Sequence, residues 1–462
     1  MQGFSWHDGE LHVDDLPLSS VAEAAGTPTY VYSARAIRAA YERLRRAFAP
    51  LNARLHYAVK ASPNLGICRL LRELGAGMDV VSGGELERAW LAGAPMSEIV
   101  FAGVGKTDAE IRAALDGRFS PLGSTSLRPG PEAPERRGPV GLFNVESPSE
   151  LESLGRLTSE LGVEARACLR VNPDVDPHTH EYTTTGKEEN KFGVDADRIV
   201  DLFDATADQP RVRLVGLHVH IGSPVPRVEP YCQAVEVLLR LVDELERRGH
   251  RIGVLNLGGG WPVDYRDDEV PPIEDYAQAL VPLLETRVQN GLRILLEPGR
   301  SILANAGLLL TRVQHVKRGR AKTFVICDGG MNVLLRPALY RAFHFVWPVA
   351  WEGPEPARTE DPQLPELEAC DVVGPICETG DFLARDRLLP ELSRGDLLGV
   401  FSAGAYGVSM ASNYNDHGRP TEILVDGASA TVIAEREPLE ALLATEAEAH
   451  PLPMPPAGPT GA

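Results

Sequence analysis

Eight short β-rich runs alternate with helical stretches over roughly the first 300 residues, and this alternation restricts the possible folds more than any other feature of the chain. Amphipathic helical patterns, such as those at 148–161 and 230–248, separate most of the runs. Strand–helix alternation repeated eight times over about 250 residues predicts an α/β fold, a (β/α)8 (TIM) barrel. Because periodicity does not show that a sheet closes, an open doubly wound sheet is the alternative. The runs occupy residues 54–60, 78–82, 99–103, 140–145, 165–171, 214–220, 252–257 and 293–297.

The pattern changes after Glu297, where strand-like runs follow one another with turns and little helix between them. This change predicts a second, mostly β domain, which the strand-like residues at the start of the chain are candidates to join. We expect the barrel at residues 28–295, the β domain at 1–27 and 296–440, and a flexible tail at 441–462.

The composition excludes several classes of protein. With 43% hydrophobic and 24% charged residues, the chain is neither disordered nor fibrous. Asp and Glu total 65 against 46 Lys and Arg, and the net charge of −19 disfavours a nucleic-acid partner. The six cysteines are too sparse for a disulfide scaffold and form no CxxC pair, so we expect no metal site. No signal peptide or long apolar run is recognisable, which predicts a soluble, cytoplasmic protein without a membrane partner.

Polar and glycine residues follow the ends of the predicted strands, where barrel enzymes carry their catalytic groups. Lys60 ends a predicted buried strand, so its ammonium must be solvated, paired or deprotonated. A lysine that reaches solvent explains this position as well as a Schiff-base lysine whose lowered pKa makes the amine nucleophilic. Gly258, Gly259 and Gly260 would let a backbone approach phosphate oxygens, although a tight turn explains them equally well.

Two more strand-end residues complete this set. Glu297 is either a solvated loop carboxylate or the partner that a pyridinium nitrogen requires. His220, taken alone, is more typical of a packed histidine than of a catalyst. Together, the lysine, the glycine run, a flat ring and a carboxylate are the parts of a site for pyridoxal 5′-phosphate (PLP).

The sequence resembles the diaminopimelate decarboxylases, PLP enzymes of the alanine racemase fold type, which also includes ornithine and arginine decarboxylases. The resemblance implies a PLP-binding barrel with a C-terminal β domain. It also implies decarboxylation of meso-2,6-diaminopimelate to L-lysine and CO2, the last step of lysine biosynthesis. The matching motifs run in family order from about residue 27 to 425: YAVKASPN, GMDVVSGGEL, FNVES, RVNPDVDPHTH, TTGKEENKFGV, GLHVHIGS, NLGGGWPVDY, EPGRSI, DGGMNVLLRPALY, VVGPICETGDFLARDRLLP and GAYGVSMASNYN.

The resemblance implies roles for individual residues. Lys60 would bind PLP covalently, His220 would stack on its ring, and Glu297 would pair with the protonated pyridine nitrogen. Cys377 would donate a proton to the substrate carbon from a loop of the partner subunit of a homodimer, although a free cysteine is more often a small buried hydrophobe. The other implied cofactor contacts are Ser223, Gly259, Gly260, Pro298, Gly299, Arg300 and Tyr406, and the implied substrate contacts are Arg300, Arg336, Tyr340, Glu378 and Tyr406.

Substrate choice depends on the far end of the substrate, where diaminopimelate carries a second ammonium and a second carboxylate. Arg300, Arg336 and Tyr340 stand at the family's carboxylate-binding positions. Glu378 stands at its ammonium-binding position. A relative that acts on arginine, ornithine or carboxynorspermidine is the alternative enzyme, whereas a racemase would lack these motifs. A PLP carrier without turnover is the alternative from another class, but such carriers have no second domain.

Three departures from the family pattern leave every implied role in place. Residues 120–138, rich in Pro, Gly and Ser, are expected to form a surface loop. Pro224 follows HIGS where many relatives carry a polar residue. Thr379 replaces the commoner serine of CESGD.

Overall fold

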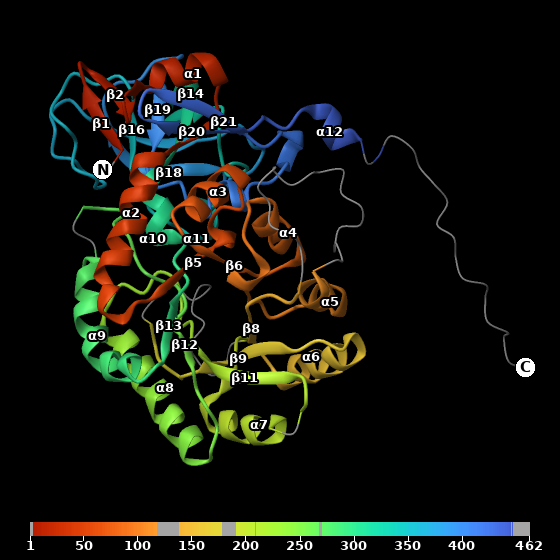
Figure 1. The fold of residues 1–462 in the computed structure, drawn as a ribbon. Helices are drawn as coiled ribbons and strands as arrows, with labels where there is room; N and C mark the ends of the chain where they lie inside the picture. The colour runs from red at the N-terminus through yellow and green to blue at the C-terminus, as the bar shows by residue number, and fades with distance from the viewer. Residues whose placement is uncertain are drawn as a thin grey trace, which may run out of the picture.

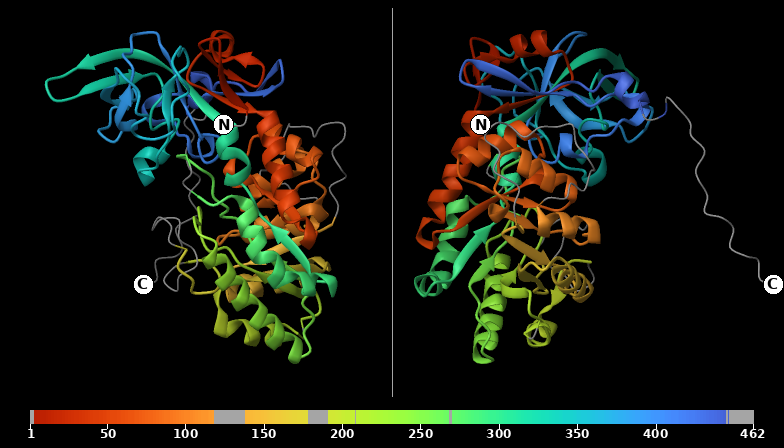
Figure 2. Two further views of the ribbon diagram at one scale, coloured as in Figure 1. Left: turned by 90° about the vertical axis from the view of Figure 1, so that its left-hand side faces the viewer. Right: turned by 45° about the vertical axis from the view of Figure 1, so that its right-hand side comes forward.

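The computed structural model describes residues 3–117, 138–177, 191–207, 209–267, 270–444 and 446. A barrel and a sheet-rich domain stand one above the other in Figure 1, and Figure 2 shows the same two bodies from other sides. Residues 120–137 of the expected surface loop lie outside the described residues, as does nearly all of the expected tail. The start of that tail belongs to a short helix, α12 (Leu439–Leu443).

Eight parallel strands close into a barrel, which confirms the (β/α)8 fold and excludes the open sheet. Each strand overlaps one of the eight runs expected from the sequence. A short strand, β10 (Val194–Asp195), pairs with β9 outside this ring. In pairing order the ring consists of β9 (Ala165–Asn172), β11 (Val212–His218), β12 (Val254–Asn256), β13 (Arg293–Leu296), β5 (Arg54–Ala58), β6 (Gly77–Val80), β7 (Ile99–Phe101) and β8 (Leu142–Val145), which pairs back with β9.

Helices surround the barrel strands, and local sequence determines where several of them begin and end (Figure 1). Thr107 and Glu110 form a capping box at the start of α5, and Gly117 ends that helix at a φ of +66°. The Ser147 side chain accepts a hydrogen bond from the Glu150 N–H at the start of α6. These caps place the helix ends relative to the strand ends. The helices are α2 (Ala34–Ala47), α3 (Leu65–Glu73), α4 (Gly83–Leu91), α5 (Asp108–Asp116), α6 (Pro148–Leu161), α7 (Ile199–Thr206), α8 (Glu229–Arg247) and α9 (Ile273–Gln289).

The second domain is built on one mixed sheet, which confirms the expected change to a mostly β texture. Its main path runs through β18 (Phe382–Leu389), β17 (Glu368–Val373), β15 (Thr323–Cys327), β14 (Gly307–Arg318), β4 (Thr29–Ser33), β20 (Thr421–Asp426) and β21 (Ser429–Ala434). Off this path, β19 (Leu397–Val400) pairs with β14 and with β16 (Val346–Pro348). Two short helices belong to the same part of the chain: α10 (Arg300–Leu303) precedes β14, and α11 (Arg336–Tyr340) follows β15.

The N-terminal segment packs with the second domain. Strands β1 (Phe4–His7), β2 (Glu10–Val13) and β3 (Leu16–Pro17) form a separate three-stranded sheet, followed by α1 (Leu18–Ala25). The Leu11 N–H donates to the Val349 carbonyl at 2.8 Å, next to β16. Strand β4 pairs with β14 and β20, although the expected boundary placed residue 28 and its successors in the barrel. The exact domain limits remain a proposal.

The β domain contacts the carboxyl end of the barrel, where the strand-end residues lie. The Tyr406 N–H donates to the Ala61 carbonyl at 2.8 Å. Asn64, which caps α3, donates to Glu422 Oε1 at 2.7 Å, and Tyr32 donates to Glu422 Oε2 at 2.9 Å. The buried glutamate on β20 therefore ties the two bodies together beside Lys60. Within the described ranges, no helix has the length and apolar character needed to cross a membrane.

Candidate active site

Lys60 lies just beyond β5, in the one-turn 3-10 helix Val59–Ala61. Its Nζ is 2.8 Å from Oδ2 of Asp79, a fully buried carboxylate on the neighbouring strand β6. Burial alone would lower the pKa of Lys60, but the carboxylates of Asp79 and Glu297 raise it above its usual value. The expectation of a lowered pKa is therefore wrong for the free amine, because the sequence pattern did not show that a carboxylate contacts it.

The pKa of Asp79 is also shifted from its usual value. Burial and the nearby Glu297 carboxylate raise the pKa of Asp79 to about 6, against the lowering effect of Lys60. About 30% of the Lys60 side chain is exposed, whereas the Asp79 side chain is fully buried. Lys60 is thus the partly accessible member of the ion pair, and Asp79 is its fully buried member.

Glu297 follows β13 and is buried, and three side chains from other strands hold its carboxylate. Asn144 and Asn256 donate amide hydrogen bonds to Oε1 at 3.0 and 2.5 Å. His218 Nε2 lies 3.4 Å from Oε2. Burial alone would raise the pKa of Glu297, but His218, Lys60 and Asn256 lower it below its usual value. The carboxylate is therefore ionised, which is the state that a protonated ring nitrogen requires of its partner.

Two glycine-containing loops, after β11 and β12, meet at the same end of the barrel. Gly260 has a φ of +94°, and a Cβ there would lie 2.2 Å from the Gly222 carbonyl oxygen. A Cβ on Gly259 would lie 2.3 Å from the Glu297 carbonyl oxygen, and one on Gly299 would lie 2.9 Å from the Ala61 Cβ. Backbone rather than side chain therefore lines this corner. An accessible amine, an ionised carboxylate and a glycine-lined corner are the donor set that PLP needs.

Arg300 and Arg336 bring two positive charges into the buried part of the site, where each is only 6% exposed. Arg300 Nη1 donates to the Tyr265 hydroxyl at 2.6 Å, and the Arg336 guanidinium lies 4.7 Å from the centre of the same ring. Within the described residues, the side-chain hydrogen bonds of the two arginines go to Ser223, Tyr265 and His344, and none of these is a carboxylate. Two buried cations without an acidic partner favour an anionic ligand.

The remaining expected contacts come from both domains, and two of them touch Arg300. Ser223 Oγ accepts from Arg300 Nε at 3.1 Å, and the Tyr406 ring centre lies 4.8 Å from the Arg300 guanidinium. Burial lowers the pKa of His220 well below its usual value, so its ring is neutral. The Pro298 carbonyl accepts from the Ala58 N–H at 3.0 Å, which joins the Glu297 segment to β5. Tyr340 ends α11, the helix that begins at Arg336.

Cys377 and Glu378 lie in the β domain and are exposed. The Cys377 N–H donates to Asn415 Oδ1 at 2.8 Å, and the Tyr414 hydroxyl donates to Glu378 Oε2 at 3.2 Å. Within the described part of the chain, the hydrogen bonds of these two residues stay inside the β domain. The exposure of Cys377 excludes the alternative of a small buried hydrophobe.

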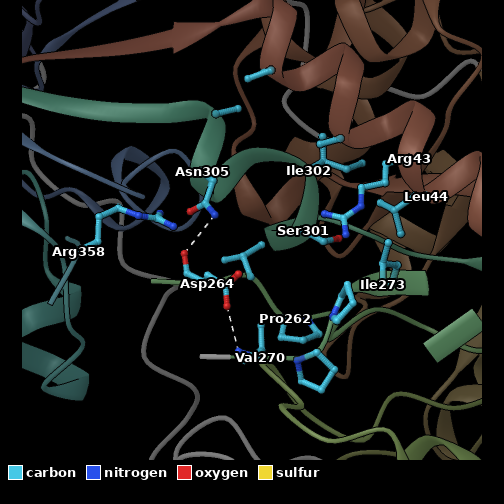
Figure 3. A pocket seen from close by; sticks show the side chains of 16 residues that line it. Arg43, Leu44, Pro262, Asp264, Val270, Ile273, Ser301, Ile302, Asn305 and Arg358 are labelled. Carbon is cyan, nitrogen blue, oxygen red and sulfur yellow. Dashed lines mark hydrogen bonds between the residues drawn. The ribbon is translucent and has the colours of Figure 1, made fainter. Parts of the chain in front are cut away.

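A hollow of about 310 Å³ lies between α2, α10 and residues 262–264 and 270–273 (Figure 3). Two hydrogen bonds join polar groups of its wall: Asn305 donates to the Asp264 carbonyl at 3.1 Å, and Asp264 Oδ1 accepts from the Val270 N–H at 2.9 Å. None of the expected site residues lines it. The hollow is therefore separate from the group around Lys60.

Comparison with known proteins agrees with this arrangement. Residues 34–304 match a family model described as a pyridoxal-dependent decarboxylase, pyridoxal binding domain. The chain is 46% identical over 446 residues to a diaminopimelate decarboxylase of Pseudomonas aeruginosa, which covers 96% of this chain and 99% of that protein. The chain belongs to the diaminopimelate decarboxylases. The same name is carried by a relative from Aquifex aeolicus that is 42% identical over 94% of each chain.

Solved structures of diaminopimelate decarboxylases have the same fold. The enzyme from M. jannaschi matches with a TM-score of 0.84 and 35% identity, over 98% of both chains. The Helicobacter pylori enzyme complexed with L-lysine matches with a TM-score of 0.81 and 35% identity, over 93% of this chain and 99% of that one. These findings confirm the family expected from the motifs, the decarboxylase activity and PLP as the cofactor.

Several residues of the site were not expected from the sequence. Asp79 lies inside an otherwise apolar strand and Asn256 ends another, and this irregularity is a signal that could have identified them. His218 is the last residue of β11 and contacts Glu297, whereas the strand was expected to end at His220. Tyr265 and His344 lie in irregular segments, where periodicity offers no signal.

Proposed function

We propose that the chain converts meso-2,6-diaminopimelate to L-lysine and CO2, using Lys60, Glu297 and the arginine pair of Arg300 and Arg336. The observation that carries the assignment of these residues is the arginine pair, buried beside the Lys60 region without an acidic partner among the described residues. A substrate with a second carboxylate supplies the missing anion. Ornithine, which has no distal carboxylate, would leave two buried charges unpaired.

When bound, PLP supplies an electron sink for the charge that remains after CO2 leaves. Lys60 would provide the amine that attaches the cofactor. Glu297 would hold a negative charge against the ring nitrogen, and the neutral His220 would lie on the ring face. The backbone at Gly259, Gly260, Gly299 and Arg300, together with Ser223, would surround the phosphate, with Tyr406 beside the cofactor and substrate.

Asp79 gives Lys60 a route for its proton. A protonated amine is not a nucleophile, so the Lys60 ammonium must lose a proton before the amine attacks. Asp79 Oδ2 lies 2.8 Å from Lys60 Nζ, within the reach of a general base. Asp79 has a pKa raised to about 6, but its carboxylate also raises the pKa of Lys60, so the ion pair is the resting state and proton transfer to Asp79 is an uphill step that frees the amine.

The proposal includes a homodimer in which Cys377 and Glu378 of one chain complete the site of the other. Both residues are exposed in the single chain and are anchored only within the β domain. Cys377 would donate a proton to the substrate carbon as a general acid, while Glu378 would bind the distal ammonium and Tyr340 would help Arg336 to bind the distal carboxylate. The expected cytoplasmic location stays part of this proposal.

The test is an assay of the purified protein with PLP and meso-diaminopimelate, in which lysine is measured by mass spectrometry. Arginine, ornithine and carboxynorspermidine run in parallel, and the Lys60→Ala variant serves as the blank. Lysine formed from diaminopimelate alone supports the proposal. A product from another amine alone would overturn the roles of Arg336 and Glu378, and the absence of any product with PLP bound would favour a carrier.

A further inference from the structure

His344 contacts the arginine pair from the side of the β domain. Arg336 Nη1 lies 2.9 Å from His344 Nε2, and His344 Nδ1 lies 2.8 Å from the Phe401 carbonyl oxygen. His344 is fully buried, and its ring meets the Tyr265 ring edge to face at 5.5 Å. The histidine is therefore fixed from three directions.

These contacts determine the tautomer of His344. A carbonyl oxygen can only accept a hydrogen bond, so Nδ1 carries the hydrogen, and Nε2 is left with the lone pair that accepts from Arg336. Burial and the nearby Arg336, Arg300 and Arg387 lower the pKa of His344 to about 3, so the ring is neutral at physiological pH.

A neutral acceptor has a different effect on Arg336 from that of a carboxylate. An aspartate or glutamate at this position would also hold the guanidinium, but it would cancel its charge and compete with an anionic ligand. The imidazole uses one donor of Arg336 and leaves the positive charge of the guanidinium for that ligand. The structure thus combines a fixed orientation with an unneutralised cation.

We propose that His344 is a positioning residue that orients Arg336 to bind the distal carboxylate of the substrate, an inference that rests on the proposed function. A series of contacts leads from His344 to Arg336, Tyr265, Arg300 and Tyr406 in turn. The Tyr406 N–H is hydrogen-bonded to the carbonyl of Ala61, the residue after Lys60. Because His344 touches Arg336 directly, whereas three more residues stand between Arg336 and the Lys60 segment, a change at His344 acts first on the carboxylate end of the substrate.

The experiment compares two ligands that differ by that one carboxylate. L-lysine and cadaverine, which is lysine without its carboxylate, are titrated calorimetrically into the PLP-loaded enzyme. His344→Asn keeps an amide near the Nδ1 position but is too short to reach Arg336, whereas His344→Gln extends an acceptor towards the Nε2 position. The Asn variant should bind L-lysine about tenfold to hundredfold more weakly than wild type and bind cadaverine unchanged, and the Gln variant should recover most of the loss.

Turnover gives a second readout. In the Asn variant, KM for meso-diaminopimelate should rise by a similar factor while kcat changes by less than about threefold, because the reacting end keeps its contacts. His56→Leu, which removes a buried histidine of the barrel that does not contact Arg336, is the control for general loosening. It should leave the ratio of the lysine and cadaverine affinities unchanged.

Each other outcome has a distinct meaning. If His344→Asn weakens both ligands equally, or neither, His344 does not orient Arg336 and the inference is wrong. If His344→Asn does not fold, His344→Leu, which fills similar space without an acceptor, takes its place: a lost lysine preference supports the acceptor role and an unchanged one opposes it. If wild type itself shows no preference for lysine over cadaverine, the proposed carboxylate site fails, independently of His344.

Discussion

Lys60, Asp79 and Glu297 form a set of buried or half-buried charges in which each group changes the ionisation of the others. The two carboxylates raise the pKa of the amine, while Lys60 and His218 help to lower that of Glu297. His344 shows the opposite case, a titratable group that burial and its cationic neighbours keep neutral. The chemistry of each residue thus depends on which charges the fold places beside it.

At the residue scale, we expect His344→Gln to reduce the acid sensitivity of the protein. The pKa of His344 is about 3 in the folded state, below the ordinary value of 6.5 that applies to the unfolded chain. Between these values the unfolded chain binds more protons, so the free energy of unfolding falls as pH falls from about 6.5 towards about 3. Wild type should lose about 2 kcal/mol more than the variant between about pH 7 and about pH 5, as measured by urea unfolding.

The exposed His7 provides the control for this measurement. His7→Gln should keep the wild-type dependence of stability on pH. Equal losses in wild type and His344→Gln would show that His344 is not held neutral in the folded protein.

At the scale of elements, the strand ends supply the charged groups and the glycine loops supply the backbone. Polar side chains from β6, β8, β11 and β12 converge on the residues after β5 and β13. The convergence follows from the closed parallel barrel, which brings all carboxyl ends to one side. Loops with a positive φ and no room for a Cβ then bring backbone close to the same place.

We expect Gly260→Ala to weaken PLP binding at least about tenfold, because its Cβ would clash with the Gly222 carbonyl at a φ that alanine rarely adopts. The measurement is a titration of the apo protein with PLP, followed by absorbance. Gly84→Ala is the matched control, since Gly84 lies in α4 and a Cβ there meets nothing closer than Ser82 Oγ at 3.8 Å. It should bind PLP normally and gain about 0.5–1 kcal/mol of stability. Equal PLP affinity in the two variants would contradict the close-approach role of Gly260.

At the scale of the whole molecule, the β domain lies over the carboxyl end of the barrel and contributes both Arg336 and the exposed Cys377 loop. Arg336 reaches the site within one chain, through its contact with Tyr265. Cys377 and Glu378 make no hydrogen bond to the barrel within the described residues. The proposed site shared between two chains would account for that difference.

Mixing two inactive variants tests the shared site. Lys60→Ala should abolish turnover, because no other amine attaches the cofactor, and Cys377→Ala should slow kcat by about 100-fold or more through loss of the proton donor. After unfolding and refolding together in equal amounts, half of the dimers pair the two variants and have one intact site each. Activity should then recover to about a quarter of wild type. Activity that stays at the mean of the two variants would show that Lys60 and Cys377 of the same chain act together.

The sequence by itself determined the order of strands and helices, the family and the identity of Lys60, Glu297, Arg300 and Arg336 as candidate site residues. These features are local, since periodicity, caps and motifs involve residues close together in the chain. It also indicated the β domain, through the change to closely spaced strand-like runs after Glu297.

Only the tertiary structure decided how those residues are charged and held. The contacts of Lys60 with Asp79, of Glu297 with His218, and of Arg336 with Tyr265 join different strands and loops. Even Arg336 and His344, eight residues apart, meet only because the chain turns back after α11 and the Phe401 carbonyl fixes the ring. Hydrogen bonds and Coulomb interactions act over a few ångströms of space whatever the separation along the chain, so no local pattern could show the neutral histidine or the raised pKa of the lysine.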